Sequence, residues 1–178
     1  MRILAGKYKS KKIETINSPF TRPMMSKVRE AIFNSLKNNI QDSYVLDLYA
    51  GSGSLGIEAM SRGAEFVTFV ENSKDCEKVI NKNLKDLDNN YKVSTLSVQT
   101  FIESSVNKYN LIFYDPPFKL QSEIVDEEVR VLSNILEKNG YLITHRHSAE
   151  NSIKFNDIYH IHKEKKYGQS KIVIVRKL

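Results

Sequence analysis

The stretch Asp47-Leu48-Tyr49-Ala50-Gly51-Ser52-Gly53-Ser54-Leu55-Gly56 decides the fold, because it joins an apolar run to a predicted helix. The apolar run, Tyr44–Tyr49, has the length and composition of a buried strand. Gly51, Gly53 and Gly56 let the backbone turn tightly and approach a ligand without a Cβ in the way. A strand, a glycine loop and a helix in this order are typical of α/β proteins whose ligands lie beyond the carboxyl ends of the strands.

Outward from this loop, apolar runs of strand length alternate with segments of helical periodicity. We expect further strands at Phe66–Val70, Val93–Val98, Asn110–Tyr114 and from Gly140 to Thr144. We expect helices from Ser26, as N-cap, to about Asn38, from the glycine loop to Gly63, from Ser73 to about Leu87, and from Ser122 to Glu137. The alternation predicts an α/β, Rossmann-like fold with a mostly parallel sheet and helices on both faces.

The C-terminal end breaks this alternation. Ile158–His162 and Lys171–Val175 are two β-rich runs, and the chain between them is too short for a crossover helix. We expect an antiparallel hairpin that turns near Gly168-Gln169 and completes a seven-stranded sheet. A mostly parallel sheet that finishes with such a hairpin is similar to the sheet of class I methyltransferases.

The composition fits a single globular domain. The chain has 178 residues, of which 40% are hydrophobic and 27% charged, so it is long enough for one core and short for two. No apolar run approaches the roughly 20 residues that a membrane helix needs, and the N-terminus has no signal-peptide h-region. The single cysteine, Cys76, predicts neither a disulfide framework nor a metal cluster, so we expect a cytoplasmic protein with no membrane partner and no metal.

Positive charge gathers at both ends of the chain. Residues 1–29 hold eight Lys and Arg against one acid, and residues 163–178 hold six against one. We therefore divide the chain into a basic N-terminal arm, residues 1–25, and a single Rossmann-like domain, residues 26–178. Basic ends favour a nucleic-acid partner, since Lys and Arg displace counterions when they neutralise phosphates. Lysine-rich ends can equally serve to keep the termini solvated.

Two carboxylates flank the glycine loop in the predicted sheet. Glu71 ends the second strand, where it can accept hydrogen bonds from both hydroxyls of a ribose. Asp47 stands at the end of the first strand, where it can help to hold the cationic amino acid part of S-adenosylmethionine and would repel the pyrophosphate of a dinucleotide. The glycine loop alone also matches nicotinamide dehydrogenases. The two acids favour a methyltransferase over that alternative.

The tetrapeptide Asp115-Pro116-Pro117-Phe118 directly follows a predicted strand, at the same edge of the sheet as the glycine loop. An exocyclic amine of a base is a poor nucleophile because its lone pair is delocalised into the ring. Asp115 and the Pro116 carbonyl can accept its N–H groups, and prolines present carbonyls rigidly. Phe118 offers a face for stacking worth roughly 1–3 kcal/mol. Transfer is then an in-line attack on a sulfonium methyl, promoted by positioning. The tetrapeptide resembles the Asp/Asn/Ser-Pro-Pro-aromatic signature of methyltransferases that act on amino or amide nitrogens.

A longer pattern spans nearly the whole chain and consists of Arg2–Lys7, Arg22-Pro23, Lys27–Leu36, Leu46–Ala59, Ser61–Ala64 and the Tyr167-Gly168 turn. In these segments the chain resembles the RsmD family of bacterial 16S rRNA guanine-N2 methyltransferases. The resemblance implies transfer of a methyl group from S-adenosylmethionine to N2 of one guanine in small-subunit rRNA, with part of the subunit already assembled. We expect a monomer, since nothing in the sequence demands a dimer.

The residue arguments and the resemblance together define a candidate site. We expect the target guanine to be held by Asp115, Pro116, Pro117 and Phe118. We expect the cofactor to be held by Asp47, Tyr49, Gly51, Ser52, Gly53, Glu71, Asn72, Ser97 and Val98. We expect RNA contacts from Arg2, Lys7, Lys9, Lys11, Lys12, Arg22, Arg29, Arg146, Lys165 and Lys166.

Three places depart from the family pattern. Met24 stands where the family usually has Thr after Arg-Pro, which puts a side-chain contact to the cofactor in doubt. Ser97 stands where the family has the Asp or Asn that meets the adenine amine, so a water or a backbone group would have to complete that contact. The run His145-Arg146-His147 follows the last strand before the hairpin, where relatives are often acidic. It either adds RNA contacts or lies in an exposed loop, and we assign its histidines no catalytic role.

Other functions stay open from the sequence. A DNA adenine-N6 or protein glutamine methyltransferase would share the tetrapeptide, but a DNA enzyme usually needs a target-recognition region for which 178 residues leave little room. A dehydrogenase would leave Asp115-Pro116-Pro117-Phe118 unexplained and lacks a recognisable hydride-transfer constellation. A non-catalytic RNA-binding module would bind RNA without transferring a methyl group.

Overall fold

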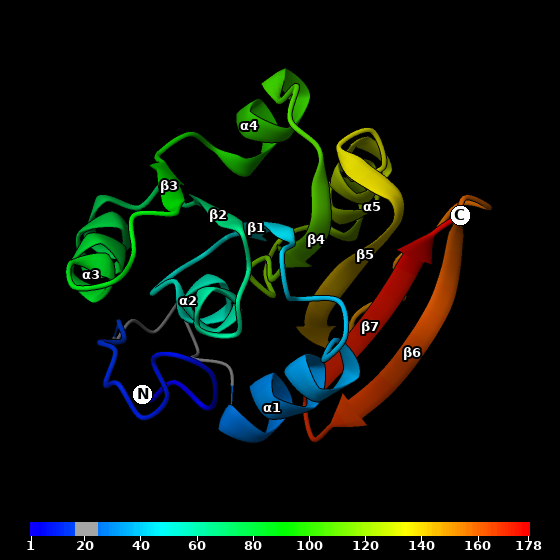
Figure 1. The fold of residues 1–178 in the computed structure, drawn as a ribbon. Coiled ribbons are helices and arrows are strands. Elements are labelled where there is room, and N and C mark those ends of the chain that lie inside the picture. The colour runs from blue at the N-terminus through cyan, green and yellow to red at the C-terminus, as the bar shows by residue number, and fades with distance from the viewer. Residues whose placement is uncertain (17–24) are drawn as a thin grey trace.

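Seven strands form one sheet in the order β3-β2-β1-β4-β5-β7-β6 (Figure 1), in a computed structural model that describes residues 1–16 and 25–178. The strands are β1 (Tyr44–Leu48), β2 (Phe66–Val70), β3 (Tyr91–Ser94), β4 (Tyr109–Tyr114), β5 (Leu136–His147), β6 (Tyr159–Tyr167) and β7 (Ser170–Lys177). The first five strands pair in parallel, and β7 pairs antiparallel with both β5 and β6. The expected fold class is confirmed, and the hairpin turns at Gly168-Gln169 as predicted.

Helices cover both faces of the sheet, because the strand residues alternate between two apolar cores. The helices are α1 (Ser26–Ser35), α2 (Ser54–Ser61), α3 (Lys74–Leu84), α4 (Val98–Ser104) and α5 (Ser122–Leu132). One core joins α1, α2 and α3 to strand residues such as Val45 and Leu111. The other core joins α4 and α5 to Leu46 and Ile112, which follow Val45 and Leu111 in the same two strands. Figure 1 shows the two sets of helices on opposite sides of the sheet.

Parallel pairing brings the carboxyl ends of β1 to β4 to one edge of the sheet. Within this register Leu48 pairs with Val70 on one side and with Tyr114 on the other. The glycine loop therefore emerges between the residues that follow β2 and those that follow β4. This edge holds most of the candidate site.

Several expected elements have other bounds in the structure. The segment predicted as a strand over Val93–Val98 ends as strand at Ser94, and Val98 begins α4. The reason is Ser97, whose Oγ accepts the backbone N–H of Thr100 and so caps a helix rather than continuing a strand. The helix α1 is also shorter than predicted, and Ser26 is its first residue rather than its cap.

The strand β5 is longer than predicted, and this changes the environment of His145, Arg146 and His147. The preceding helix α5 ends at Leu132 instead of Glu137, and β5 begins at Leu136 and continues through His147. His145, Arg146 and His147 pair with Ile172, Lys171 and Ser170 of β7. Because of this pairing they are strand residues, and His145 and Arg146 are buried. The exposed-loop interpretation is wrong.

The described part of the N-terminal arm, residues 1–16, packs against α2. Ile3 and Ile13 are buried in the core beneath it. The backbone N–H groups of Leu4 and Ala5 donate to the carboxylate of Glu58 at 2.8 and 3.1 Å. The arm is thus anchored by apolar burial and by one internal carboxylate. Across residues 1–16 and 25–178, no helix has both the length and the apolar character needed to traverse a bilayer.

Candidate active site

The glycine loop is folded over the carboxylate of Asp47 in β1. Asp47 Oδ2 accepts the backbone N–H of Gly56 at 2.8 Å, which ties the start of α2 back to the strand. Gly53 has a φ of +77°, and a Cβ on Gly56 would lie 2.2 Å from the ring of Phe69. The turn therefore requires glycine at both positions. Asp47 is only 1% exposed, so it supports the loop from beneath and can act on a ligand through its charge.

Glu71, the residue after β2, closes the other side of the glycine loop. Its Oε2 accepts the backbone N–H of Gly51 at 2.9 Å, and its Oε1 accepts that of Ser73 at 2.8 Å. Each carboxylate oxygen has a second lone pair, so both can still accept hydrogen bonds from ligand hydroxyls. Asn72 is exposed beside it, and Ser52 lies on the loop with its carbonyl held by Asn83 at 2.9 Å.

Negative charge is concentrated at this edge of the sheet. Burial raises the pKa of Asp47 well above its usual range, the hydrogen bond from Gly56 opposes that rise, and the charges of Asp115 and Glu71 add to it. A site with three acids favours a cationic ligand and disfavours a phosphate. These three carboxyl groups therefore fit the sulfonium and ammonium groups of S-adenosylmethionine better than they fit a pyrophosphate.

Tyr49 connects the glycine loop to α5 on the far side of β4. Its hydroxyl donates to the carboxylate of Glu128, with the two oxygens at 2.9 and 3.0 Å, and Tyr114 donates to the same carboxylate at 2.6 Å. Burial raises the pKa of Glu128, and the two hydroxyl donors oppose the rise. Tyr49 has a φ of +57°, an unfavourable conformation for a tyrosine. Its anchored hydroxyl leaves only the half-buried ring to meet a cofactor.

Ser97 and Val98 follow β3 at the same edge. The Ser97 hydroxyl accepts the N–H of Thr100 at 3.1 Å and lies 2.8 Å from the Thr100 hydroxyl, so it is engaged in capping α4. Val98 is buried in the core under α4 and α5. The site therefore presents the N-terminus of α4 at the position where the resembling family has Asp or Asn.

Asp115 begins the loop after β4, beside the glycine loop. Its backbone N–H faces the carbonyl of Leu48 at 3.5 Å, and its Oδ1 lies 2.7 Å from Nδ1 of His145. The Phe118 ring meets the rings of His145 and His147 edge-on, with centroids 5.4 and 5.5 Å apart. Pro116 is buried, whereas Pro117 is exposed. The tetrapeptide thus lies at the carboxyl edge of the sheet, and Asp115 is its residue nearest to β4.

The rest of this loop is held by Arg146. The guanidinium donates to the carbonyls of Pro117 and Leu120, both at 3.0 Å, and one of its nitrogens lies 3.8 Å from Glu150. Arg146 is 5% exposed. Its expected role as an RNA contact is therefore wrong, because its donors point into the protein and are used by the loop that carries Asp115.

Arg29 is also buried rather than available to RNA. It is 0% exposed, and its guanidinium donates to the backbone carbonyl of Arg2 and to the sulfur of Met1. Burial lowers the pKa of Arg29, and the neighbouring carboxylate of Glu58 opposes that effect. Arg29 holds the N-terminal arm against α1, so the RNA contact expected there is corrected. Arg22, another expected contact, lies outside the described residues.

The lysines of the N-terminal arm fall into two pairs. Lys7 makes a 2.6 Å ion pair with Asp88, and Lys11 lies 3.8 Å from Asp86. Lys9 and Lys12 are exposed and make no ion pair within residues 1–16 and 25–178. Arg2 is exposed as well, although one of its nitrogens donates to the Ser10 carbonyl at 2.8 Å. Only part of the arm's positive charge is therefore unneutralised.

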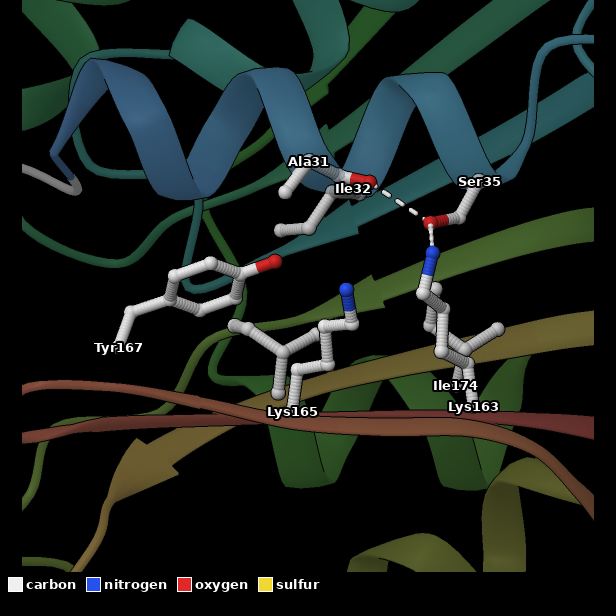
Figure 2. Close-up of a pocket in the computed structure, with 8 residues that line it drawn as sticks. Ala31, Ile32, Ser35, Lys163, Lys165, Tyr167 and Ile174 are labelled. Carbon is white, nitrogen blue, oxygen red and sulfur yellow. Dashed lines mark hydrogen bonds between the residues drawn. The ribbon is translucent and has the colours of Figure 1, made fainter.

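Lys165 and Lys166 lie on opposite faces of β6, because successive strand residues alternate. Lys165 shares a shallow pocket with Lys163 and Tyr167, and all three face α1, as Figure 2 shows. In that pocket Lys163 donates to the hydroxyl of Ser35 at 2.6 Å. The two expected contacts, Lys165 and Lys166, therefore cannot meet the same surface of an RNA.

Sequence reasoning missed the roles of His145 and Arg146 in holding the Asp115 loop, of Ser170 in holding His145, and of Glu128 in holding Tyr49. Each acts on a partner more than ten residues away in the chain, such as His145 on Asp115. No local pattern marks such partners. The one available signal was the basic run His145-Arg146-His147 at a position where relatives are often acidic.

Comparisons with known proteins agree with this geometry. The protein family described as "Conserved hypothetical protein 95" matches residues 1–176. Ribosomal RNA small subunit methyltransferase D of Escherichia coli is 36% identical, over 80% of this chain and 69% of its own length. The Haemophilus influenzae protein of the same name is 39% identical, over 80% of this chain and 76% of its own. The solved structure of yhhF from Escherichia coli superposes with a TM-score of 0.90 at 28% identity, over 99% of this chain and 97% of that one.

Proposed function

Because this chain belongs to the family of ribosomal RNA small subunit methyltransferases D, and is an S-adenosylmethionine-dependent methyltransferase of 16S rRNA, we propose that it methylates the exocyclic N2 of a guanine. The observation that carries the proposal is the position of Asp115 and Phe118. They lie beside a glycine loop that is closed by Glu71, at the carboxyl edge of a parallel sheet.

S-adenosylmethionine supplies an electrophilic methyl group on a positively charged sulfur. The chain contributes the surroundings that hold this cation. The free lone pairs of Glu71 would accept the two ribose hydroxyls, and the loop Gly51–Gly53, which Glu71 holds, would receive the amino acid part. The buried carboxyl group of Asp47 lies beneath this loop and holds it through the N–H of Gly56. Ser97, Val98 and Asn72 would lie on the adenine side of the bound cofactor, and the half-buried ring of Tyr49 would help to enclose it.

The chain's own residues make the guanine amine reactive. The Asp115 carboxylate and the Pro116 carbonyl accept its two N–H groups, which favours a tetrahedral nitrogen whose lone pair is free to attack. Phe118 stacks on the base, and Pro117 fixes the loop between them. As the nitrogen–carbon bond forms, the carbon–sulfur bond breaks and its electron pair goes to sulfur. One amine proton then passes to Asp115. Positioning rather than a covalent enzyme intermediate supplies the rate.

We place the RNA on the surface around this edge, where exposed basic residues remain. Arg2, Lys9 and Lys12 are exposed on the arm, and on the hairpin one of the two exposed lysines, Lys165 or Lys166, can contribute, since they lie on opposite faces of β6. We further propose that the substrate is 16S rRNA in a partly assembled small subunit, and that the enzyme acts as a monomer in the cytoplasm. Fewer free cations are available than the net charge of +6 suggests. A pre-folded RNA surface would compensate for this because it presents its phosphates already ordered.

The test uses a strain that lacks this gene and is complemented with the chain. Mass spectrometry of 16S rRNA fragments should show one N2-methylguanine that is absent from the deletion strain and present in the complemented strain. Purified free 16S rRNA and small-subunit particles from the deletion strain should then be compared as substrates, with particles methylated at least about tenfold faster, an expectation from ordering costs. A methyl group on adenine, or on a protein, would overturn the proposed target. Sedimentation of the active enzyme tests the monomer.

A further inference from the structure

His145 lies at the centre of a chain of hydrogen bonds that crosses three neighbouring strands. Its Nδ1 lies 2.7 Å from Asp115 Oδ1, just beyond the end of β4, and its Nε2 lies 2.9 Å from the hydroxyl of Ser170 at the start of β7. The imidazole itself stands on β5 and its side chain is 7% exposed, whereas that of Asp115 is 28% exposed. The chain of bonds therefore opens to a ligand through the carboxylate of Asp115.

The partners of the imidazole assign its tautomer. An ionised Asp115 can only accept a hydrogen bond, so a neutral His145 must carry its proton on Nδ1. The Nε2 atom then bears a lone pair, and the rotatable hydroxyl of Ser170 donates to it. This arrangement satisfies all three side chains at once. It also occupies one oxygen of the carboxylate and leaves Oδ2 as the oxygen available to a substrate.

We propose that His145 is a positioning residue for methyl transfer, which holds the Asp115 carboxylate with Oδ2 directed at the guanine amine. The proposal rests on the proposed function. The hydrogen bond from Nδ1 restricts rotation of the carboxylate about its Cβ–Cγ bond. When the amine proton passes to Oδ2, the bond to Oδ1 keeps the carboxyl group in the same orientation. His145 itself touches neither substrate nor cofactor.

A second contact gives His145 a matching role for the base. Its ring packs edge-on against Phe118, at a centroid distance of 5.4 Å and an interplanar angle of 72°. The same imidazole thus fixes the residue that accepts the amine proton and the residue that stacks on the ring. A fixed geometry of this kind matters because misplacement of a reacting group by about 1 Å can cost about 100-fold in rate.

The first experiment compares three substitutions at His145 on small-subunit particles from the deletion strain. In His145→Asn the amide N–H falls near the place of Nδ1, whereas in His145→Gln it falls near the place of Nε2. His145→Ala should lower kcat about 10- to 100-fold and leave KM for the particle within about twofold. His145→Asn should recover most of that loss, and His145→Gln should not. His160→Ala, at an exposed position on β6, should match the wild type.

Two readouts exclude a merely structural role. Binding of S-adenosylhomocysteine by calorimetry, and the urea midpoint, should stay near wild-type values in His145→Asn and His145→Gln, so that their difference in kcat reports geometry. A wild-type kcat in His145→Ala, or an equal loss in Asn and Gln variants, would overturn the proposal. Ser170→Ala should lower kcat only about threefold, since it removes the hydrogen bond at Nε2 but keeps the one between Nδ1 and Asp115. A loss as large as that of His145→Ala would also count against the proposal.

A measurement without substrate separates this proposal from the proposed function. Nitrogen-15 NMR of the wild-type chain labelled at histidine should show His145 protonated on Nδ1, with an N–H resonance that changes in Asp115→Asn and persists in His160→Ala. A His145 protonated on Nε2 would sink the positioning role even in an active enzyme. Failure of the wild type to methylate guanine, with the NMR signature intact, would instead refute the proposed function.

Discussion

The glycine loop and the Asp115 loop lie side by side at one edge of the sheet, yet they are held in different ways. The glycine loop is held by its own backbone: the N–H groups of Gly51 and Gly56 donate to Glu71 and Asp47. The Asp115 loop is held by side chains of a strand that comes about thirty residues later, since His145 and Arg146 bind its carboxylate and its carbonyls.

The difference separates what local sequence encodes from what strand pairing adds. A backbone-held loop needs glycines and nearby acids, so its motif is visible in the sequence. A side-chain-held loop needs donors on a neighbouring strand, and these can change between relatives while the loop is kept. We expect cofactor binding to depend on the first loop and catalytic rate on the second. The following predictions test that division, from the largest expected effect to the smallest.

Asp115→Ala should divide the two functions most clearly. Loss of the carboxylate removes the acceptor of the amine proton, so methyl transfer should fall by about 100-fold or more. The glycine loop is untouched, so the dissociation constant for S-adenosylhomocysteine should change by less than about threefold, a shift below 1 kcal/mol. Tritium transfer to particles and calorimetry measure the two quantities. Wild-type turnover in this variant would remove Asp115 from the mechanism.

Arg146→Met should destabilise the Asp115 loop from its other side. The substitution keeps the apolar stem but leaves two carbonyls, those of Pro117 and Leu120, without their donor. The free energy of unfolding should fall by about 2 kcal/mol, as urea denaturation would measure, and kcat should fall with it. Arg130→Met is the matched control: that arginine is exposed and pairs only with Glu127, so its loss should cost less than about 0.5 kcal/mol. An equal loss of unfolding free energy in the two variants would show that the buried guanidinium of Arg146 contributes no more to stability than an exposed ion pair.

Glu71→Gln should affect the cofactor and little else. The amide keeps the shape of the side chain but replaces one acceptor oxygen by an NH2 donor. This donor then faces the N–H of Gly51 or of Ser73, and the side chain loses one acceptor for a ribose hydroxyl. We expect affinity for S-adenosylhomocysteine to weaken about tenfold, equivalent to about 1.4 kcal/mol. Glu65→Gln, exposed at the other end of β2, provides the control. An unchanged dissociation constant in Glu71→Gln would exclude the ribose role.

Asp47→Asn should change how stability depends on pH. The pKa of Asp47 is raised in the folded chain, chiefly by burial, so the folded state holds this proton more tightly than the unfolded state. Its contribution to stability is therefore full below the unfolded pKa of about 3.9 and is lost as pH rises through the folded pKa. Asparagine still accepts the N–H of Gly56 but does not titrate. Relative to the wild type, Asp47→Asn should gain in unfolding free energy as the pH rises above the unfolded pKa of about 3.9. An exposed substitution, Glu137→Gln, should run parallel to the wild type.

The smallest effect should come from the arm lysines, compared as two pairs. Lys9→Gln with Lys12→Gln removes unpaired charges, so the slope of log affinity for RNA against log salt should become shallower by about 1 to 2. Lys7→Gln with Lys11→Gln removes charges already paired with Asp88 and Asp86, and should change the slope less. Identical slopes for both pairs and the wild type would show that the arm does not contact RNA.

The sequence predicted the sheet, the hairpin and the placement of both loops, because each depends on local periodicity or on glycine and proline at fixed places. The short helix α4 was missed since Val98 extends an apolar run and Ser97 reads as strand until its capping bond to Thr100 is seen. The environment of Arg29 and Arg146 was wrong because charge composition does not reveal which guanidinium finds carbonyls inside the core. The partners of Asp115 and Tyr49 could not be predicted, since they arise from tertiary contacts across β4.

The place of β7 has a consequence for how the enzyme is synthesised. Translation delivers β5 before β7, and β7 then enters the sheet between β5 and β6. Until residue 170 has left the ribosome, the Ser170 hydroxyl cannot form its hydrogen bond with Nε2 of His145. The edge of β5 that pairs with β7 is also unpaired until then. A chain that ends before β7 therefore holds the glycine loop, Asp115 and His145 but lacks the Ser170 hydroxyl that supports the His145 ring. The hydrogen-bonded support of Asp115 is therefore complete only after β7 has been translated and has paired with β5.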